Sequence, residues 1–206
     1  MMKKLENFWY HYKWHTIVAV FLVAVGIFSA WQLVSAPDYD YQIMLYTSRS
    51  DTTALSTALQ QEILKIGDDL NADGEVTVQI MNVSYSEMDQ NQSFVNSQAQ
   101  ALRGELLSNR CFLIITDDDR FKQLSEEGYF EPLELGSNDG KSYRIDDGSN
   151  FGKNILSRFQ EMNYKYAGDI ENGLNFSLRY PVRDSEETTK TRENQKQLLY
   201  KIKEVG

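Results

Sequence analysis

The part of the chain that follows residue 37 contains no histidine. The chain has 206 residues and two histidines, His11 and His15, which both lie near the N-terminus. Imidazole is the general base of Ser-His and Cys-His sites and a ligand in most zinc sites. The lack of histidine therefore excludes these sites, HExxH metal centres among them, from residues 38–206.

Cysteine is almost as scarce, because Cys111 is the only one and no disulfide can form within the chain. Cys111 begins the apolar run CFLIIT (111–116), which predicts that its side chain is buried. Since burial raises the pKa of a thiol, we interpret Cys111 as a core residue, with a reactive thiol as the alternative. The enzymes that remain use carboxylate or Ser-Lys chemistry, and the sequence has no motif for either.

Basic residues are in the minority. The chain has 21 lysines and arginines against 30 aspartates and glutamates, and residues 38–206 keep 18 of the first and 29 of the second, a net charge of −11. Such a surface repels nucleic acid and anionic lipid. No basic stripe with interleaved aromatics occurs, so we exclude nucleic-acid binding. An acidic surface is compatible with bound cations or with a basic partner.

A long uncharged run, TIVAVFLVAVGIFSAWQLVS, covers residues 16–35. As a helix it would be about 30 Å long, which is the thickness of the hydrocarbon core of a bilayer. Basic residues precede the run and acidic residues follow it: Lys3, Lys4 and Lys13, then Asp38 and Asp40. By the positive-inside rule this asymmetry places the N-terminus in the cytoplasm. The run therefore predicts a single transmembrane helix.

Cleavage as a signal peptide is the alternative to a membrane anchor. Val34-Ser35-Ala36 is a small-residue pattern that signal peptidase accepts, but Pro37 would follow the cut and disfavour it. We therefore expect an uncleaved signal-anchor at the cell membrane. Its parts would be a cytoplasmic stub over 1–15, the transmembrane helix over 16–35, and one extracellular domain over 38–206, which is long enough for its own core.

Hydrophobic periodicity predicts alternating strands and helices in the domain. We expect strands over 40–48, 75–85 and 111–116, and helices over 50–67, 91–109 and 119–127. Ser50 or Asp51 is the expected N-cap of the first of these helices, and Asp119 that of the third. This order predicts an α/β fold with a mostly parallel sheet flanked by helices on both faces. The remainder predicts a surface loop (136–150), a helix (150–162), a strand (174–182) and a terminal helix (185–205).

Two segments resemble known proteins. In DDDRFKQLSEEGYFEPLEL (117–135) an acidic turn after a strand leads into a helix and then into G-Y-F-x-P-L. With this segment, residues 41–135 resemble one lobe of an extracellular solute-binding protein of the periplasmic-binding type II class. The N-terminal KLENFWYHYKWHT (4–16) is similar to membrane-anchored, mostly uncharacterised proteins of Gram-positive bacteria.

Solute-binding proteins close two lobes around a ligand, whereas this domain has the length of little more than one lobe. The resemblance therefore implies a binding fold that is kept for another use, such as contact with a membrane-protein partner. Whether the domain also takes a small-molecule ligand stays open.

The stretch DLNADGEVTV (69–78) spaces its oxygen side chains like an EF-hand calcium loop, with Gly74 at the position of the sharp turn. The candidate ligands are Asp69, Asn71, Asp73, Glu75 and Thr77. The twelfth position is Ile80, which cannot coordinate. One interpretation is a structural calcium site completed by a distant carboxylate, and the other is a tight turn without metal, for which Asn, Asp and Gly are typical.

The acidic turn Asp117, Asp118 and Asp119 follows the most apolar predicted strand. Open parallel sheets bind ligands at the carboxyl ends of their strands, so this turn is a candidate ligand-facing site for a divalent ion or an amine. The alternative is that Asp119 caps the next helix while the other two carboxylates face solvent, near the positive end of the helix dipole.

Three functional hypotheses follow. The leading one is a single-pass, membrane-anchored extracellular binding domain that is not an enzyme and engages a membrane partner. The second is a degenerate solute-binding subunit of a transporter, and the third is a carboxylate-based hydrolase. Apart from the calcium of the loop interpretation, we expect no cofactor, and we assign no catalytic residue.

Overall fold

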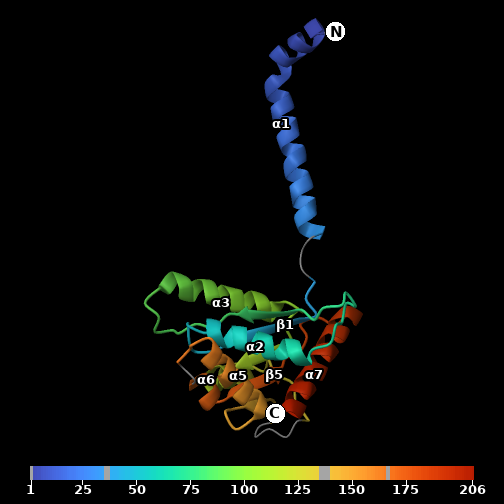
Figure 1. Cartoon of the computed structure of the whole chain (residues 1–206). Coiled ribbons are helices and arrows are strands. Elements are labelled where there is room, and N and C mark those ends of the chain that lie inside the picture. Colours follow the sequence, from blue (N-terminus) through green and yellow to red (C-terminus); the bar gives the residue numbers. More distant parts are fainter. Residues whose placement is uncertain (1, 35–37, 135–139, 166–167) are drawn as a thin grey trace. The chain divides into compact units, whose positions relative to one another are not determined.

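The computed structural model of the chain describes residues 2–34, 38–134, 140–165 and 168–206, except the side chains of 2–13, 30, 32–34 and 169 (Figure 1). The chain divides into two compact units, Met1–Asp38 and Tyr39–Gly206. The second unit is called the domain below.

The first unit consists of the helix α1 (Met2–Val34). Among the residues that the structure describes, no helix is both long enough and apolar enough to span a bilayer. This finding contradicts the predicted transmembrane signal-anchor helix over 16–35. A span needs about 20 consecutive, predominantly apolar residues, or about 30 Å, and none of the described helices meets this condition. Residues 35–37 of the proposed cleavage pattern lie outside the described residues.

The domain contains one sheet of five strands in the order β2-β1-β3-β5-β4. The strands are β1 (Tyr41–Tyr46), β2 (Val78–Asn82), β3 (Leu113–Thr116), β4 (Tyr143–Ile145) and β5 (Leu174–Leu178). β1 is parallel to β2 and to β3, while β5 runs antiparallel to β3 and to β4. The predicted α/β class is confirmed, but the sheet is mixed where a mostly parallel one was predicted.

Strand β4 lies in the segment 136–150 that was predicted to be a surface loop, of which 136–139 lie outside the described residues. It has only three residues, Tyr143, Arg144 and Ile145, which are too few to establish an alternation. Its place is set by pairing with β5, which brings Ile145 opposite Leu174. Such a pairing between distant segments is not visible in local periodicity.

Helices cover both faces of the sheet, because side chains along a strand point alternately to its two faces. Ile43 and Leu45 of β1 join one apolar cluster, and Met44 and Tyr46 join the other. The helices are α2 (Thr53–Ile66), α3 (Gln92–Leu107), α4 (Asp118–Glu126), α5 (Asn150–Glu161), α6 (Gly168–Glu171) and α7 (Glu186–Val205). The first cluster includes α2, α5, α6 and α7, and the second includes α3 and α4 (Figure 1).

Arg179, directly after β5, is a charged residue in the interior and is only 1% exposed. Its Nε donates to the carbonyl oxygen of Cys111 at 2.6 Å, and Nη1 donates to that of Leu106 at 3.3 Å. Nη2 donates to the carbonyl oxygen of Ser108. The last carbonyl groups of a helix have no partner within the helix. Arg179 therefore satisfies the end of α3 and joins it to β3 and β5.

The substitution Arg179→Ala should lower the free energy of unfolding by about 3 kcal/mol, because it leaves buried carbonyl groups without donors. Urea unfolding followed by circular dichroism measures this change. The exposed Arg183 provides the control, and Arg183→Ala should stay within about 0.5 kcal/mol of the parent. Equal effects of the two substitutions would contradict the role of Arg179.

Helices α2 and α5 are joined by the buried carboxylate of Glu62, which accepts from Lys65 Nζ at 2.5 Å and from Arg158 Nε at 2.9 Å. Burial acts to raise the pKa of Glu62, but the hydrogen bonds and charges of Lys65 and Arg158 outweigh it and hold the pKa below the ordinary value. A lowered pKa in the folded state contributes stability above the unfolded pKa of about 4.3. This contribution is lost as the pH falls through the folded pKa.

We therefore expect the free energy of unfolding to fall more steeply between pH 6 and pH 3 in the parent chain than in Glu62→Gln. Urea titrations at several pH values test this expectation. Parallel pH profiles for the two chains would show that Glu62 does not contribute to the acid sensitivity.

Candidate functional site

Polar side chains from most of the strands meet at one edge of the sheet, which we call the carboxyl edge. β1, β2 and β3 are parallel, so their carboxyl ends lie together. β5 begins at the same edge, where Asn175 is opposite Thr116, and β4 ends there. The carboxyl edge comprises Thr47, Ser48, Ser84, Tyr85, Asp117, Asp118, Arg144 and Asn175.

Asp117 holds the beginning of α4 to the end of β1. Its Oδ1 accepts from the backbone N–H of Arg120 at 3.0 Å, which makes Asp117 the N-cap of α4. Its Oδ2 accepts from the backbone N–H of Ser48 at 2.6 Å. The predicted cap, Asp119, is wrong by two residues, since the chain leaves β3 at Thr116 and becomes helical at Asp118. Both oxygens of Asp117 are thus engaged by the backbone.

Asp118 connects α4 to the antiparallel strands. Its Oδ1 accepts from Arg144 Nη1 at 2.5 Å and from Asn175 Nδ2 at 2.7 Å. Partial burial acts to raise the pKa of Asp118, but these two hydrogen bonds and the charge of Arg144 lower it below the ordinary value. The side chain of Asp118 remains 62% exposed, so it is the carboxylate of this edge that combines a fixed position with access to solvent.

The three carboxylates of the acidic turn do not converge on one point. Asp117 accepts from backbone N–H groups and Asp118 pairs with Arg144, while Asp119 lies exposed at the beginning of α4. Throughout the described part of the chain, no group of three or more His, Cys, Asp or Glu residues is placed to hold a metal ion. The acidic turn therefore connects α4 to the strands β1, β4 and β5. Of its three residues, Asp118 is the one on which the predicted ligand-facing site now depends.

Arg120 forms a buried cluster with two tyrosines that the sequence did not reveal. Its guanidinium carbon lies 4.8 Å from the ring centre of Tyr46 and 4.9 Å from that of Tyr85. Nη2 donates to the carbonyl oxygen of Tyr85 at 3.2 Å, and Nη1 donates to Glu87 at 3.2 Å and to Gln123 at 3.0 Å. A charged residue in a helix is ordinarily exposed. The only hint in the sequence was a tyrosine at the end of β1, Tyr46, and another three residues after β2, Tyr85.

Two buried polar atoms at or beside this edge have no hydrogen-bond partner among the described residues, Thr47 Oγ1 and Arg120 Nε. Thr47 is fully buried and Arg120 is 6% exposed. The backbone N–H of Thr47 does have an acceptor, Ser84 Oγ, at 3.0 Å. Buried polar atoms in proteins are usually satisfied. These two atoms are therefore unsatisfied buried groups at this edge.

The beginning of α2 lies beside the same edge. The N-cap is Thr52, not Ser50 or Asp51 as predicted, and its side chain makes no capping hydrogen bond. The Ser50 hydroxyl instead donates to Asp89 Oδ2 at 2.8 Å and accepts from the N–H of Ser86 at 3.2 Å. Contacts with the loop after β2 therefore determine where the helix begins.

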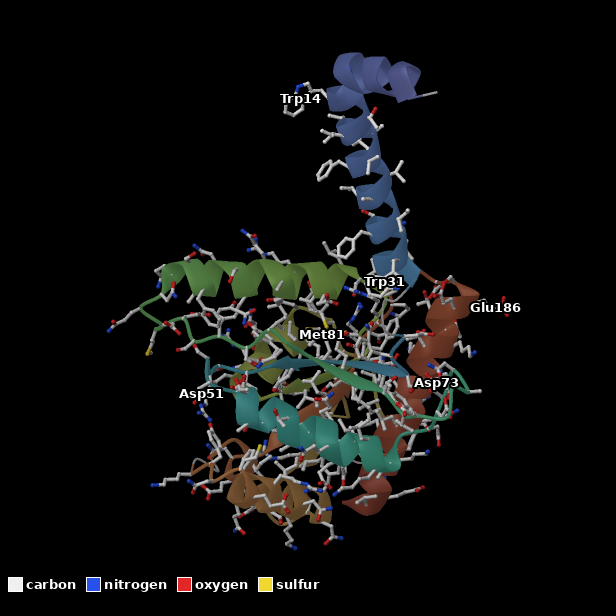
Figure 2. The ribbon with its side chains drawn as sticks, turned by 45° about the horizontal axis from the view of Figure 1, so that its top comes forward. Trp14, Trp31, Asp51, Asp73, Met81 and Glu186 are labelled. Carbon is white, nitrogen blue, oxygen red and sulfur yellow. The ribbon has the colours of Figure 1, made fainter. Side chains whose placement is uncertain are left out.

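The candidate calcium loop lies at the opposite edge of the sheet. Figure 2 shows Asp51 and Asp73 beyond opposite ends of α2. Within the loop, Asp69 accepts from the N–H groups of Asp73 at 3.2 Å and Gly74 at 2.9 Å. Asp73 in turn accepts from the N–H of Glu75 at 2.9 Å. These bonds are those of a tight turn, in which Gly74 has a positive φ of 95°.

Asp40, immediately before β1, is not part of this loop but joins its two ends by hydrogen bonds. One of its oxygens accepts from the N–H of Leu70 at 2.7 Å and the other from the N–H of Thr77 at 2.7 Å. Partial burial acts to raise the pKa of Asp40, but these bonds lower it below the ordinary value. The sequence did not single out Asp40. The bonds of the loop agree with the turn interpretation and do not test calcium binding by Asp69, Asn71, Asp73, Glu75 and Thr77, which stays a prediction.

Cys111 is a fully buried free cysteine, so the prediction of a core residue is confirmed. Its Sγ lies 3.8 Å from Glu105 Oε2. Burial, together with the negative charge of Glu105, raises the pKa of the thiol to about 12.

Comparison with known protein families finds no family that matches the chain, and comparison with curated proteins finds no similar sequence. The resemblance to a solute-binding lobe therefore stays a prediction, as does the location of residues 38–206 outside the cell.

Asp117→Ala should lower the free energy of unfolding by about 1–2 kcal/mol, because it removes the cap of α4 and the acceptor for Ser48. Asp119→Ala is the matched control in the same turn and should stay within about 0.5 kcal/mol. Urea unfolding of the two variants distinguishes them. A larger loss of unfolding free energy for Asp119→Ala would show that Asp119 caps α4, as the sequence predicted.

The Cys111 thiol should not react with a thiol reagent such as Ellman's reagent in the native chain at pH 8, because it is buried and protonated. One thiol per chain should react after denaturation in guanidinium chloride. Stoichiometric labelling of the native chain within minutes would contradict the core position.

Proposed function

We propose that the domain is a non-enzymatic interaction domain that binds another polypeptide. The observation that carries this proposal is the use of the polar groups at the carboxyl edge. Asp117 is engaged by two backbone N–H groups, and Asp118, although exposed, is engaged by Arg144 and Asn175. The Cys111 thiol is buried. A catalytic acid, base or nucleophile must instead be free to exchange a proton with a substrate or to attack it.

The net charge supports the same proposal and indicates the chemistry of the partner. Residues 38–206 carry a net charge of −11, and no histidine is present among them to act as a base near neutral pH. An acidic surface favours partners of opposite charge and raises their rate of association. A basic polypeptide segment is therefore the expected ligand.

Binding of a small molecule is the second candidate function, as the resemblance to a solute-binding lobe implies. Thr47 Oγ1 and Arg120 Nε favour it, because both are buried without a partner near the ends of β1 and β3. In open α/β sheets, ligands bind where the connections from neighbouring strands diverge.

A dye-based thermal melt of the full chain separates these candidates, because a ligand that binds only the folded state raises Tm. The panel contains sugars, amino acids, calcium chloride with a chelator control, and a library of peptides ten residues long. We expect an increase in Tm with basic peptides and no change with sugars or amino acids. An increase with a sugar or an amino acid alone would overturn the proposal in favour of the second candidate.

A further inference from the structure

The outer side of the edge strand β2 offers unpaired backbone groups. Two bonds define which residues face β1: Tyr41 N–H donates to the carbonyl oxygen of Thr77 at 3.2 Å, and Val83 N–H donates to that of Leu45 at 2.9 Å. Since alternate residues of a parallel strand bond to the same neighbour, residues 78, 80 and 82 face away from β1. Gln60 Nε2 from α2 donates to the carbonyl oxygen of Val78 at 2.6 Å, which agrees with a carbonyl group that points away from β1. For Ile80 and Asn82, the described residues provide no backbone partner on the outer side.

The two outermost strands of the sheet, β2 and β4, differ in how their free sides are protected. β4 is three residues long and has the charged Arg144 at its centre, both of which hinder pairing with a further strand. β2 lies within residues 76–86, where no charged residue and no proline occurs. Natural proteins usually protect an edge with charges, proline or a bulge. β2 has neither charge nor proline.

The side chains of β2 are also incompletely covered. Ile80 and Met81 pack against the two different apolar clusters, one on each face of the sheet, and both are only partly buried. Figure 2 shows Met81 on the strand that lies between α2 and α3. A further strand beside β2 would extend both clusters and cover these side chains.

We propose that β2 binds an extended peptide segment of a partner protein as a sixth strand of the sheet, with an apolar centre and basic residues at both ends of the segment. The inference rests on the proposed function and specifies its partner. Backbone N–H and C=O groups of an edge strand are satisfied by another extended backbone, which is the known mode of strand addition. The charge follows from acidic residues on both sides of β2: Asp73 and Glu75 before it, and Glu87 and Asp89 after it.

The same charges disfavour a second copy of this chain as the occupant. A two-fold antiparallel pairing of β2 with a second copy, centred on Ile80, would bring the turn that contains Asp73 toward the turn that contains Glu87 of the other copy, at both ends of the pairing. Like charges that are brought together repel each other. A basic-ended peptide replaces both repulsions by attractions.

The test measures fluorescence anisotropy of a labelled peptide with lysine at both ends and alternating valine and threonine between them, titrated with the full chain. Two further peptides carry backbone N-methyl groups on alternate residues, one set on odd and the other on even positions. Strand addition requires the N–H groups on one side of the peptide only. We expect one methylated peptide to bind at least tenfold more weakly than the other, and a peptide with glutamate ends to bind at least tenfold more weakly than the lysine form.

Ile80→Pro tests the same contact from the side of the protein. The N–H of Ile80 faces outward, so proline removes an outer donor without breaking a bond to β1. We expect at least tenfold weaker binding of the lysine-ended peptide. Ile80→Val is the matched control that keeps the N–H and should bind like the parent. Circular dichroism verifies that both variants are folded.

If both methylated peptides bind equally, or a folded Ile80→Pro binds like the parent, β2 is not the docking edge, although the proposed function stands because peptide binding remains. If the lysine-ended peptide does not bind, this proposal is overturned. In that case the proposed function holds only if a peptide of the library raises Tm in the thermal melt. A dimer in light scattering that Ile80→Pro converts to a monomer would identify a second copy as the occupant and overturn the peptide partner.

Discussion

The domain depends on a buried cation whose hydrogen bonds go to backbone carbonyl groups, the guanidinium of Arg179. Transfer of a charge into the interior is costly unless hydrogen bonds replace those of water. Carbonyl groups from the end of α3 and from Cys111 supply these bonds, and the ring of Phe112 lies 5.1 Å from the guanidinium carbon. Carbonyl groups at the end of a helix also carry partial negative charge. One side chain thereby fixes the relative positions of α3, β3 and β5.

Different hydrogen bonds hold the two ends of the parallel strands to the neighbouring loops and helices. At one end, Asp40 accepts hydrogen bonds from both sides of the loop between α2 and β2. At the other end, Asp117 and Asp118 connect α4 to β1, β4 and β5. Most acidic groups that looked available in the sequence therefore hold the fold together. The outer side of β2 lacks such a connection over Ile80 and Asn82 in the described structure.

Local patterns in the sequence located the long elements and failed where distant contacts decide. α2, α3, α5 and α7 overlap their predicted ranges because apolar residues recur at helical spacing. Three adjacent aspartates could each cap α4, and the bond from Ser48, which is 69 residues away, selects Asp117. β4 has too few residues for a pattern, and no local pattern marks Arg120 as buried. The predicted transmembrane helix came from an uncharged run and the charges on either side of it, and it is contradicted.

The position of β5 determines the order in which the sheet can be assembled during synthesis. Within the described residues β4 pairs only with β5, and β5 lies between it and β3. A nascent chain that ends before residue 174 can form the parallel strands β1, β2 and β3, but its β4 has no strand to join. Until β5 emerges, the side of β3 that β5 will cover exposes backbone groups of an apolar strand. Such an open edge is a site of aggregation, so the chain should be most prone to aggregate before β5 enters the sheet.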